Sequence, residues 1–545
     1  MTPDTLTKLL FLLMLIPLVG GLSLTFIPQG YDRMTKLGAV IFSLAGFLAS
    51  LVLAWNFDWS NPGMQLAGVL TWVPALALQF SVGVDNIAMW LVLLTTFLSF
   101  VVIAASTSAV TYRVKEFFAW MLILEASMVG AFIATDLIFF YLCFEFTLVP
   151  IFFLVGVHGS ADRLKAARVF FLYTFVGSLL TLVGILYVAW WHYFNKGFWS
   201  FAFEDIYATA GLMSPTQQTL VLLSMLAGFA VKVPLFPIHT WQPLTYSEAP
   251  TGASALLAGV LLKLSTYGLV RLAIPLAPLA AVKAAPCIAM LAIIGIIYAA
   301  LIAWVQKDLK KVIAYSSMSH MGFCVLGMFA LNLTGLTGSV AYMVNHGLST
   351  AALFLCVGIL IERFNTRQIT ELGGLARVMP VWAFFMVFFV FTSVGLPGLN
   401  GFVGEFLTLL GAFTNLERLG PWYAVTAGIG MILAAIYLLY MTGRLVFGPL
   451  KYPGLPGSDE HTAGHATPVS TSQVRDLTGR EIALLSSIAI CCLWLGLYPK
   501  PMLNTLEPSL ERAVIARVTP DKVRPIVTDA SVPTSQTLAS ASDQH

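Results

Sequence analysis

The strongest constraint on this chain is a series of apolar runs, each about as long as a membrane-spanning helix. A helix rises about 1.5 Å per residue, so about 20 apolar residues cross a hydrocarbon core about 30 Å thick. Such runs occupy residues 9–28, 37–56, 85–106, 117–135, 137–156, 167–194, 218–239, 251–274, 285–304, 311–331, 337–361, 380–415, 423–447 and 482–498. We therefore predict an all-α polytopic membrane protein with about 14 transmembrane helices.

Composition supports this class and excludes others. Hydrophobic residues make up 58% of the chain and charged residues only 10%, against about 25% in a soluble protein. The net charge is +3, and Lys and Arg do not gather into a basic face, which argues against nucleic acid as a partner. The six cysteines fall in apolar runs without metal-ligand spacing, so we expect no metal and no cofactor on this chain.

The connections between the apolar runs are mostly short. The longer ones are residues 57–84, 195–217 and 448–481, and none of them can hold an active site of its own. Residues 500–545 form a polar tail that ends in a stretch rich in Ser, Thr and Pro, and we expect this tail to be disordered. The apolar runs are expected to lie in the lipid bilayer.

Alternate loops differ in positive charge. One set carries fifteen Lys and Arg residues, while the other carries five before the tail: Lys8, Lys196, Arg271, Lys283 and Arg418. Cytoplasmic loops of membrane proteins are enriched in Lys and Arg. The first set is therefore predicted to be cytoplasmic, with both termini on the external side.

Several ionisable residues fall near the middle of their apolar runs. Glu125, Glu145, Lys263, His320 and His346 each lie roughly 12 to 18 Å from the start of the expected helix, so they should share one depth in the membrane. A charge at that depth costs roughly 2.5–3.5 kcal/mol on insertion scales. Residues kept at such a cost indicate a proton or ion path.

Lys232 and Glu405 join this set where their helices are interrupted. Pro234 and Pro237 follow Lys232, and Pro397 lies in a glycine-rich stretch before Glu405. Irregular backbone at membrane depth is tolerated only inside protein or beside water. Two interrupted helices in matching positions of two halves are typical of inverted-repeat transporters.

The signs of these charges suit proton transfer. A Glu145 and Lys232 pair is expected to change protonation when a nearby charge moves, and the imidazoles of His320 and His346 are expected to hand a proton on. Water must fill the gaps between stations on different helices. Taken singly, a buried histidine is more often a structural hydrogen-bond partner between helices. Glu125 is either a further path residue or a structural partner of a neighbouring helix.

Two further charged residues have structural interpretations. Arg271 ends its apolar run, and we expect its side chain to reach the membrane interface. Glu248 precedes Ala249 and Pro250, and we expect it to cap the next helix near Thr251.

Six stretches carry a resemblance to a known family. They are FFYLCFEFTLVPIFFLVGVHG (139–159), RVFFLYTFVGS (168–178), VKVPLFPIHTWQPLTYSEAPTGASALLAGVLLKLSTYGLVRL (231–272), KDLKKVIAYSSMSHMGF (307–323), NHGLSTAALFLCVGILIERFNTRQITELGGL (345–375) and GLPGLNGFVGEF (395–406). Together they make residues 80–450 resemble the antiporter-like subunits of respiratory complex I, NADH:quinone oxidoreductase, and among them subunit M of bacteria, the counterpart of mitochondrial subunit 4.

The resemblance implies a fold and a set of site residues. The fold would hold two inverted five-helix repeats at 117–274 and 285–447, preceded by helices in 1–116 and followed by a cytoplasmic loop (448–481) and a last helix (482–499). The family's proton-path positions fall on Glu145, Lys232, Lys263, His320, His346 and Glu405. An acid at position 405 distinguishes subunit M from its sister subunits, which usually carry a lysine there.

The resemblance also implies a function. The chain would be a proton-translocating subunit of the bacterial inner membrane, within a translocase whose redox chemistry lies elsewhere. FMN, iron-sulfur clusters and quinone would bind partner subunits, which include the sister antiporter-like subunits. The alternatives are a subunit of a multisubunit cation/proton antiporter, or of a membrane-bound hydrogenase or a ferredoxin-linked relative. Glu405 favours the first interpretation over the antiporter.

The chain departs from its apparent family at a few positions. Phe144 stands where a tryptophan is usual, and Arg168 where a lysine is usual. Leu244 and Tyr246 replace an acid and a histidine in the segment after Trp241. These departures concern the cytoplasmic side of the first interrupted helix rather than the central line of charges.

Overall fold

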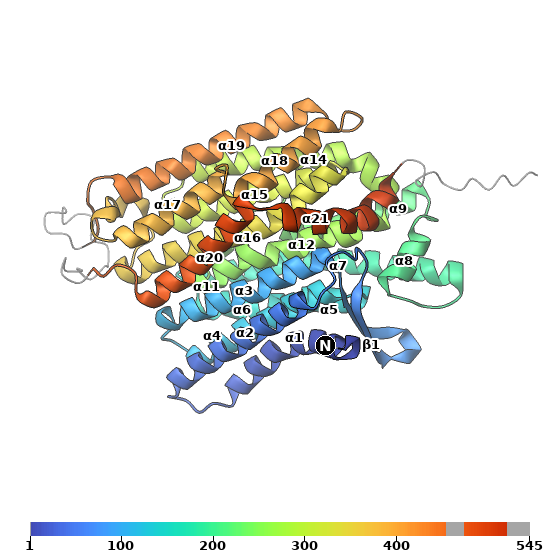
Figure 1. Ribbon diagram of the computed structural model, residues 1–545, viewed down its shortest axis with the longest axis horizontal. Helices are drawn as coiled ribbons and strands as arrows, with labels where there is room; N and C mark the ends of the chain where they lie inside the picture. The colour runs from blue at the N-terminus through green and yellow to red at the C-terminus, as the bar shows by residue number, and fades with distance from the viewer. Residues whose placement is uncertain (1, 454–473, 520–545) are drawn as a thin grey trace, which may run out of the picture.

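The computed structural model describes residues 2–453 and 474–519, which form a bundle of helices lying side by side (Figure 1). Twelve helical stretches in this part of the chain are long and apolar enough to cross a membrane. They are α1 (Pro3–Thr25), α2 (Asp32–Trp55), α3 (Asn86–Ala109), α4 (Val114–Ile133), α5 and α6 (Leu137–His158), α7 (Arg163–Lys196), α11 to α13 (Thr251–Leu276), α14 (Pro278–Val305), α15 (Leu309–Phe329), α16 (Leu333–Phe364), α19 with η6 (Pro421–Phe447) and α20 (Gly479–Leu497).

Two further crossings are each made of two shorter helices. The first consists of α9 (Pro215–Lys232) and α10 (Trp241–Glu248), and the second of α17 (Pro380–Val394) and α18 (Asn400–Thr414). With the twelve continuous stretches they account for the predicted number of spans. The prediction of an all-α polytopic membrane protein is confirmed.

Local sequence explains both interruptions. Pro234 and Pro237 lie between α9 and α10 and have no backbone N–H to continue a helix. Between α17 and α18, Gly395 and Gly398 adopt φ angles of +80° and +93°, which only glycine adopts easily, and Pro397 lies between them. The N–H of Gly395 still bonds to the carbonyl of Phe391 and so closes the last turn of α17.

The stretch from Thr251 to Leu276 is the central helix of the bundle. Its whole apolar window is buried, whereas the windows of α1, α2 and α20 are about one third buried. Two π-helical segments, η2 (Leu257–Leu261) and η3 (Leu269–Ala273), interrupt its α-helical turns α11 (Thr251–Leu256), α12 (Leu262–Gly268) and α13 (Ile274–Leu276). Such segments widen a helix locally and occur frequently at functional sites.

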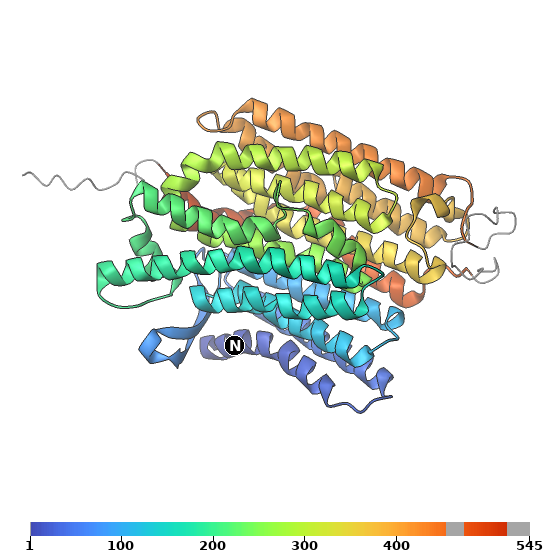
Figure 2. The same cartoon turned by 180° about the vertical axis from the view of Figure 1, so that it is seen from behind.

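The bundle has two distinct ends, seen from both sides in Figures 1 and 2. The end that we call the hairpin end carries an antiparallel hairpin of β1 (Gln65–Val73) and β2 (Leu78–Val84), joined through η1 (Pro74–Leu76), and also α8 (Phe203–Ala210). The opposite end, which we call the basic end, carries the short loops rich in Lys and Arg and the turns η4 (Ile369–Glu371) and η5 (Leu375–Arg377).

The expectation of a disordered tail from residue 500 is wrong for its first part. Residues 500–518 form α21 (Lys500–Leu510), η9 (Glu511–Ile515) and α22 (Ala516–Val518). Their buried side chains recur about every four residues, at Met502, Leu506, Leu510 and Val514. This apolar stripe packs against the bundle and outweighs the polar composition of the segment. Residues 520–545, and residues 454–473 of the expected cytoplasmic loop, lie outside the described part.

Close contact between α16 and α18 generates a prediction about stability. A Cβ at Gly404 would lie 2.5 Å from Cβ of Tyr342, and one at Gly338 would lie 2.6 Å from Cβ of Leu407. We expect Gly404→Ala to force the helices apart and destabilise the protein by about 1–3 kcal/mol. The measurement is the thermal unfolding midpoint of the purified protein in detergent.

The matched control is Gly428→Ala in α19, because a Cβ at Gly428 meets no atom within 4 Å. We expect this variant to unfold at the same temperature as the wild type or slightly higher. Equal midpoints for the two variants would contradict the prediction.

Candidate functional site

Four buried ionisable side chains from four helices form one line that starts at Lys263, near the end of the first half of the molecule, and continues into the second half. Nζ of Lys263 in α12 lies 2.8 Å from Nδ1 of His346 in α16. The rings of His346 and His320 in α15 have centroids 5.8 Å apart, and Nδ1 of His320 lies 3.0 Å from Oε1 of Glu405 in α18. Each of the four residues is at most 2% exposed. The structure thus brings together four of the predicted path residues.

The position of Lys263 depends on its helix. Its ammonium group donates to the carbonyl of Ala258 at 2.5 Å as well as contacting His346. Ala258 belongs to the π-helical segment η2, immediately before α12. The lysine therefore folds back towards the start of its own helix, on the basic-end side.

Tyr342 is a member of this line that the sequence analysis missed. Its hydroxyl lies 2.7 Å from Nδ1 of His320 and donates to Oε1 of Glu405. Tyr342 precedes His346 by one helical turn, so the two residues share one face of α16. That spacing was the available signal, but tyrosine is common in apolar helices and the spacing alone does not identify it.

Two features fix Glu405 at the second helix interruption. Asn345 of α16 and Asn400 of α18 each donate to the other's main-chain carbonyl, at 2.8 and 3.1 Å, and so tie the start of α18 to α16. A Cβ at Gly395 would lie 2.6 Å from Oε2 of Glu405. Glycine at this position therefore leaves room for the second carboxylate oxygen.

The line has the chemistry of a proton relay. Each imidazole can accept a proton on one nitrogen and donate from the other. The Nε2 atoms of His320 and His346 and Oε2 of Glu405 are buried, and none has a hydrogen-bond partner within the described residues. These free polar atoms can bind water, which would link the two rings.

The first half of the molecule holds Lys232 and Glu145. Nζ of Lys232 donates to the main-chain carbonyl of Phe144 at 3.0 Å and lies 3.5 Å from the centroid of the Phe144 ring. Glu145 is the next residue, but its two buried carboxylate oxygens make no hydrogen bond within the part of the chain described. The predicted partners are therefore neighbours without a direct ion pair.

Aromatic rings separate Lys232 from Lys263. Phe144 contacts Phe229 with ring centroids 5.6 Å apart, and Phe140 connects Phe229 to Tyr267 at 6.3 and 6.4 Å. No hydrogen bond between described residues joins the two lysines directly. The predicted line thus consists of two groups with an apolar boundary between them.

Glu125 lies apart from both groups. Its side chain in α4 is completely buried, and neither oxygen has a hydrogen-bond partner within residues 2–453 and 474–519. A Cβ at Gly46 of α2 would lie 3.2 Å from Oε1 of Glu125. The carboxyl group therefore faces α2, and no hydrogen bond or ion pair in the described part joins it to Glu145 or Lys263.

A network of charges occupies the basic end. Arg367 contacts Glu248 at 2.8 Å and Asp308 at 2.7 Å, while Oε2 of Glu248 accepts from the N–H of Asp162 at 3.0 Å. The expectation that Glu248 caps the next helix is wrong, because α11 has no side-chain cap. Glu248 instead binds an arginine that is distant in the sequence, so no local pattern indicated it.

Arg271 also differs from its expectation. Its side chain does not reach out of the protein, because it is only 5% exposed and its guanidinium forms an ion pair with Asp85. The central helix continues to Leu276, and α8 and the helices of the former tail lie over its hairpin end. Elements remote in the sequence thus bury a residue that ends an apolar run.

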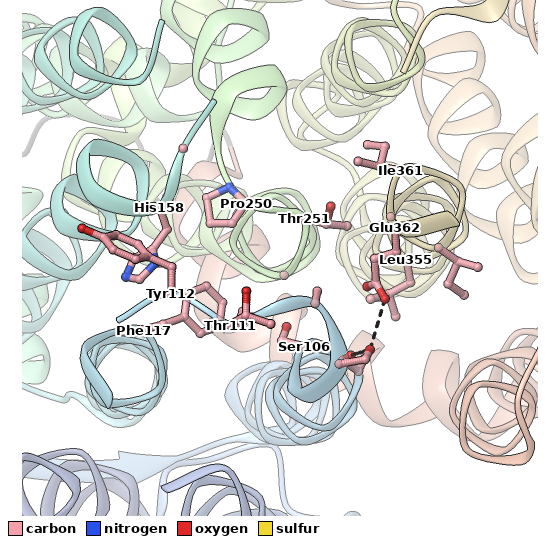
Figure 3. Close-up of a pocket in the computed structure, with 18 of the residues that line it drawn as sticks. Ser106, Thr111, Tyr112, Phe117, His158, Pro250, Thr251, Leu355, Ile361 and Glu362 are labelled. Carbon is pink, nitrogen blue, oxygen red and sulfur yellow. Dashed lines mark hydrogen bonds between the residues drawn. The ribbon is translucent and has the colours of Figure 1, made fainter. Parts of the chain in front are cut away.

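A cavity of about 860 Å³ lies at the basic end (Figure 3). His158 and Tyr112 stand on one side of it and Glu362 on the other, where Glu362 accepts a hydrogen bond from Ser108 at 3.2 Å. The cavity reaches Thr251 at the start of the central helix. Thr251 lies about 18 Å from Lys263 along that helix.

The segment that departs from the apparent family lies in the protein interior. Trp241, Gln242 and Tyr246 of α10 are fully buried, and Leu244 is half-buried. The Tyr246 ring contacts Phe354 of α16, with centroids 6.0 Å apart. This segment therefore joins the first interrupted helix to the helix that carries His346.

Comparisons with known proteins agree with the geometry. Residues 134–436 match the family described as NADH:quinone oxidoreductase/Mrp antiporter. Subunit M of the NADH-quinone oxidoreductase of Rhodobacter capsulatus is 38% identical over 93% of this chain and 96% of its own. Chain 4 of the NADH-ubiquinone oxidoreductase of Arabidopsis thaliana is 39% identical over 92% of this chain and 96% of its own.

Solved structures show the same relationship. A chain of respiratory complex I from Thermus thermophilus, with bound NADH, aligns with a TM-score of 0.81 and 30% identity, over 94% of this chain and 100% of that chain. A chain of the Mrp complex from Dietzia aligns with a TM-score of 0.76 and 20% identity, over 93% of this chain and 52% of that chain, which shows a shared fold only. The chain belongs to the NADH:quinone oxidoreductase/Mrp antiporter family, and within it to the subunit M and chain 4 proteins, which are membrane subunits of complex I.

Proposed function

We propose that this chain translocates protons across the membrane as a subunit of a complex I-type NADH:quinone oxidoreductase. The observation that carries the proposal is the buried row from Lys263 through His346 and His320 to Glu405, in which hydrogen bonds join the first two and the last two residues and the two imidazole rings lie 5.8 Å apart. Charged and titratable groups at membrane depth carry a large cost and mark ion pathways. A purely structural subunit would have no use for them.

The line from Lys263 to Glu405 would pass protons by short steps. Lys263 and His346 exchange a proton directly across 2.8 Å, and His346 reaches His320 through bound water or a ring rotation. Tyr342 and His320 both contact the same oxygen of Glu405, so either can deliver a proton to that carboxylate. Water beside Gly395 and the interrupted backbone would connect Glu405 to the outside.

The first half would respond to a partner subunit. Glu145 lies between Leu142 and Phe146, which are 41% and 47% exposed on the surface of the bundle. A charge change in a subunit bound at this surface would therefore act on Glu145 over a short distance through a low dielectric. FMN, iron-sulfur clusters and quinone would belong to other subunits, whose redox reactions produce that change.

The two halves of the molecule would be inverted repeats of one another. We assign the first inverted repeat to residues 117–274 and the second to 285–447, because each would contain one interrupted helix with an ionisable residue beside the break. We assign the basic end to the cytoplasm, with both termini external, in a bacterial inner membrane. The Lys and Arg count on alternate loops supports this orientation.

The proposal predicts the behaviour of the first-half charges. We expect Lys232→Ala and Glu145→Ala to assemble normally but to lose most proton pumping, because charge changes in the partner would no longer reach Lys263. The measurement is proton uptake driven by NADH in inverted membrane vesicles. Lys196→Ala, at the exposed end of α7, is the matched control and should pump normally. Full pumping in either test variant would remove that residue from the mechanism.

A second prediction concerns the hydroxyl of Tyr342. Its loss in Tyr342→Phe removes one hydrogen bond to a charged group, worth about 1.5–3 kcal/mol, so we expect pumping about tenfold slower or more. The control is Tyr437→Phe, whose buried hydroxyl bonds to Ser316 at 2.8 Å, outside the line. The measurement is the initial rate of NADH-driven proton uptake. Equal rates in the two variants would exclude Tyr342 as a relay group.

A third prediction tests the orientation. Ser60 of the hairpin end and Arg377 of the basic end are both exposed, and each can be replaced by cysteine. In intact spheroplasts of a strain that also carries Cys287→Ala, we expect a membrane-impermeant maleimide to label position 60 and not position 377. Permeabilised cells should show labelling at both positions. The opposite pattern in intact spheroplasts would reverse the proposed topology.

A further inference from the structure

The central helix carries a second row of polar residues that leads away from the relay. Tyr267 and Arg271 follow Lys263 at intervals of four residues, so the three residues share one face of the helix and lie progressively closer to the hairpin end. Each interval spans about 6 Å along the helix. The row therefore forms a potential branch from Lys263 towards the external side.

Arg271 is held tightly at the end of this row. Its Nε donates to the hydroxyl oxygen of Tyr267 at 3.3 Å, and its Nη2 forms the ion pair with Asp85. Asp85 in turn accepts from the N–H of Ala88 at 2.9 Å as the cap of α3, and Tyr207 of α8 donates to the Arg271 carbonyl at 2.5 Å. Asp85 and Tyr267 thus hold the guanidinium, while Tyr207 holds the main chain of Arg271.

The pair stands at the wall of a cavity of about 410 Å³ at the hairpin end. The cavity is lined by Asp85, Arg271 and Tyr207 on the inner side and by the exposed residues Glu204 and Arg512 further out. Tyr267, by contrast, is only 1% exposed and does not line this cavity. The Arg271–Asp85 pair therefore separates a polar cavity from the buried row that begins at Lys263.

A guanidinium at this place interrupts proton transfer. Each group in a proton wire must accept a proton on one side and donate one on the other, but arginine has five N–H donors and no acceptor, and it stays protonated in proteins. Its fixed positive charge also repels an approaching hydronium ion, as in other pores that exclude protons. The Tyr267 oxygen that would continue the wire already accepts the Nε–H of Arg271.

We propose that the Arg271–Asp85 pair is a proton barrier that closes the hairpin end of the first half, so that a proton on Lys263 passes to His346 and not into the cavity. The position of Lys263 fits this role, because its ammonium contacts Ala258 and His346 on the side away from Tyr267. The proposal rests on the proposed proton route through Lys263.

The test measures passive proton leak in vesicles that contain the whole complex, without NADH. The double variant Arg271→Gln with Asp85→Asn removes both charges but keeps a neutral pair that can hydrogen-bond, which avoids an unpaired buried carboxylate. We expect an imposed pH gradient to decay at least threefold faster than in wild-type vesicles. Arg512→Gln, which lines the same cavity outside the pair, should leave the decay unchanged.

Two further variants test whether the leak depends on the guanidinium and whether it passes through Lys263. Arg271→Lys keeps the charge and the contact with Asp85, but an ammonium can release a proton, so we expect at least twofold faster decay. Adding Lys263→Ala to the double variant should restore slow decay, because the leak passes through Lys263. Wild-type decay in both Arg271 variants would overturn the proposal, as would a leak that persists without Lys263.

The same vesicles separate this proposal from the proposed function. Lys263→Ala alone, driven by NADH, tests whether the route carries pumping at all, whereas the passive leak requires no turnover. Normal pumping by Lys263→Ala would reject the route. Lost pumping by Lys263→Ala together with unchanged leak in the Arg271 variants would reject only the barrier.

Discussion

The cost of holding a charge inside a membrane governs this structure. Lys263 lies in a fully buried helix, where an unpaired ammonium would be strongly unfavourable. The helix itself supplies one partner, because the carbonyl of Ala258, in the π-helical segment before the lysine, accepts a hydrogen bond from the ammonium group. His346 supplies the second partner from α16. His320 and Glu405 also contact neighbours that can exchange a proton, whereas Glu125 and Glu145 have no hydrogen-bond partner within the described residues.

The two helix interruptions position Lys232 in the first half and Glu405 in the second. Beside the first break, Lys232 reaches the carbonyl of Phe144 and the face of its ring instead of a carboxylate. Beside the second, the left-handed turn at Gly395 leaves space for Glu405, and the reciprocal Asn345–Asn400 contacts hold α18 against α16. The aromatic boundary between the two groups means that a change at Lys232 must act on Lys263 through charge or water, because no hydrogen bond between described residues joins the two lysines.

The two ends of the bundle are built differently. At the basic end, Glu248, Arg367 and Asp308 join the first half to the second with ion pairs, next to a cavity open to water-sized molecules. At the hairpin end, a single buried pair of Arg271 and Asp85 stands between a second cavity and the central helix. This asymmetry agrees with a protein that takes up protons on one side and controls where they leave.

The sequence by itself determined the class, the number of crossings, both helix interruptions and the ionisable residues at mid-depth, because apolar length, proline, glycine and buried charge act locally along the chain. Only the tertiary structure decided which of these residues meet: that His346 contacts Lys263, that Tyr342 joins Glu405, and that no other described residue hydrogen-bonds to Glu125 or Glu145. Arg271 and Glu248 show the reason, since their partners Asp85 and Arg367 lie far away in sequence. Such contacts depend on which helices pack side by side, and a pattern of neighbouring residues in the sequence does not predict that packing.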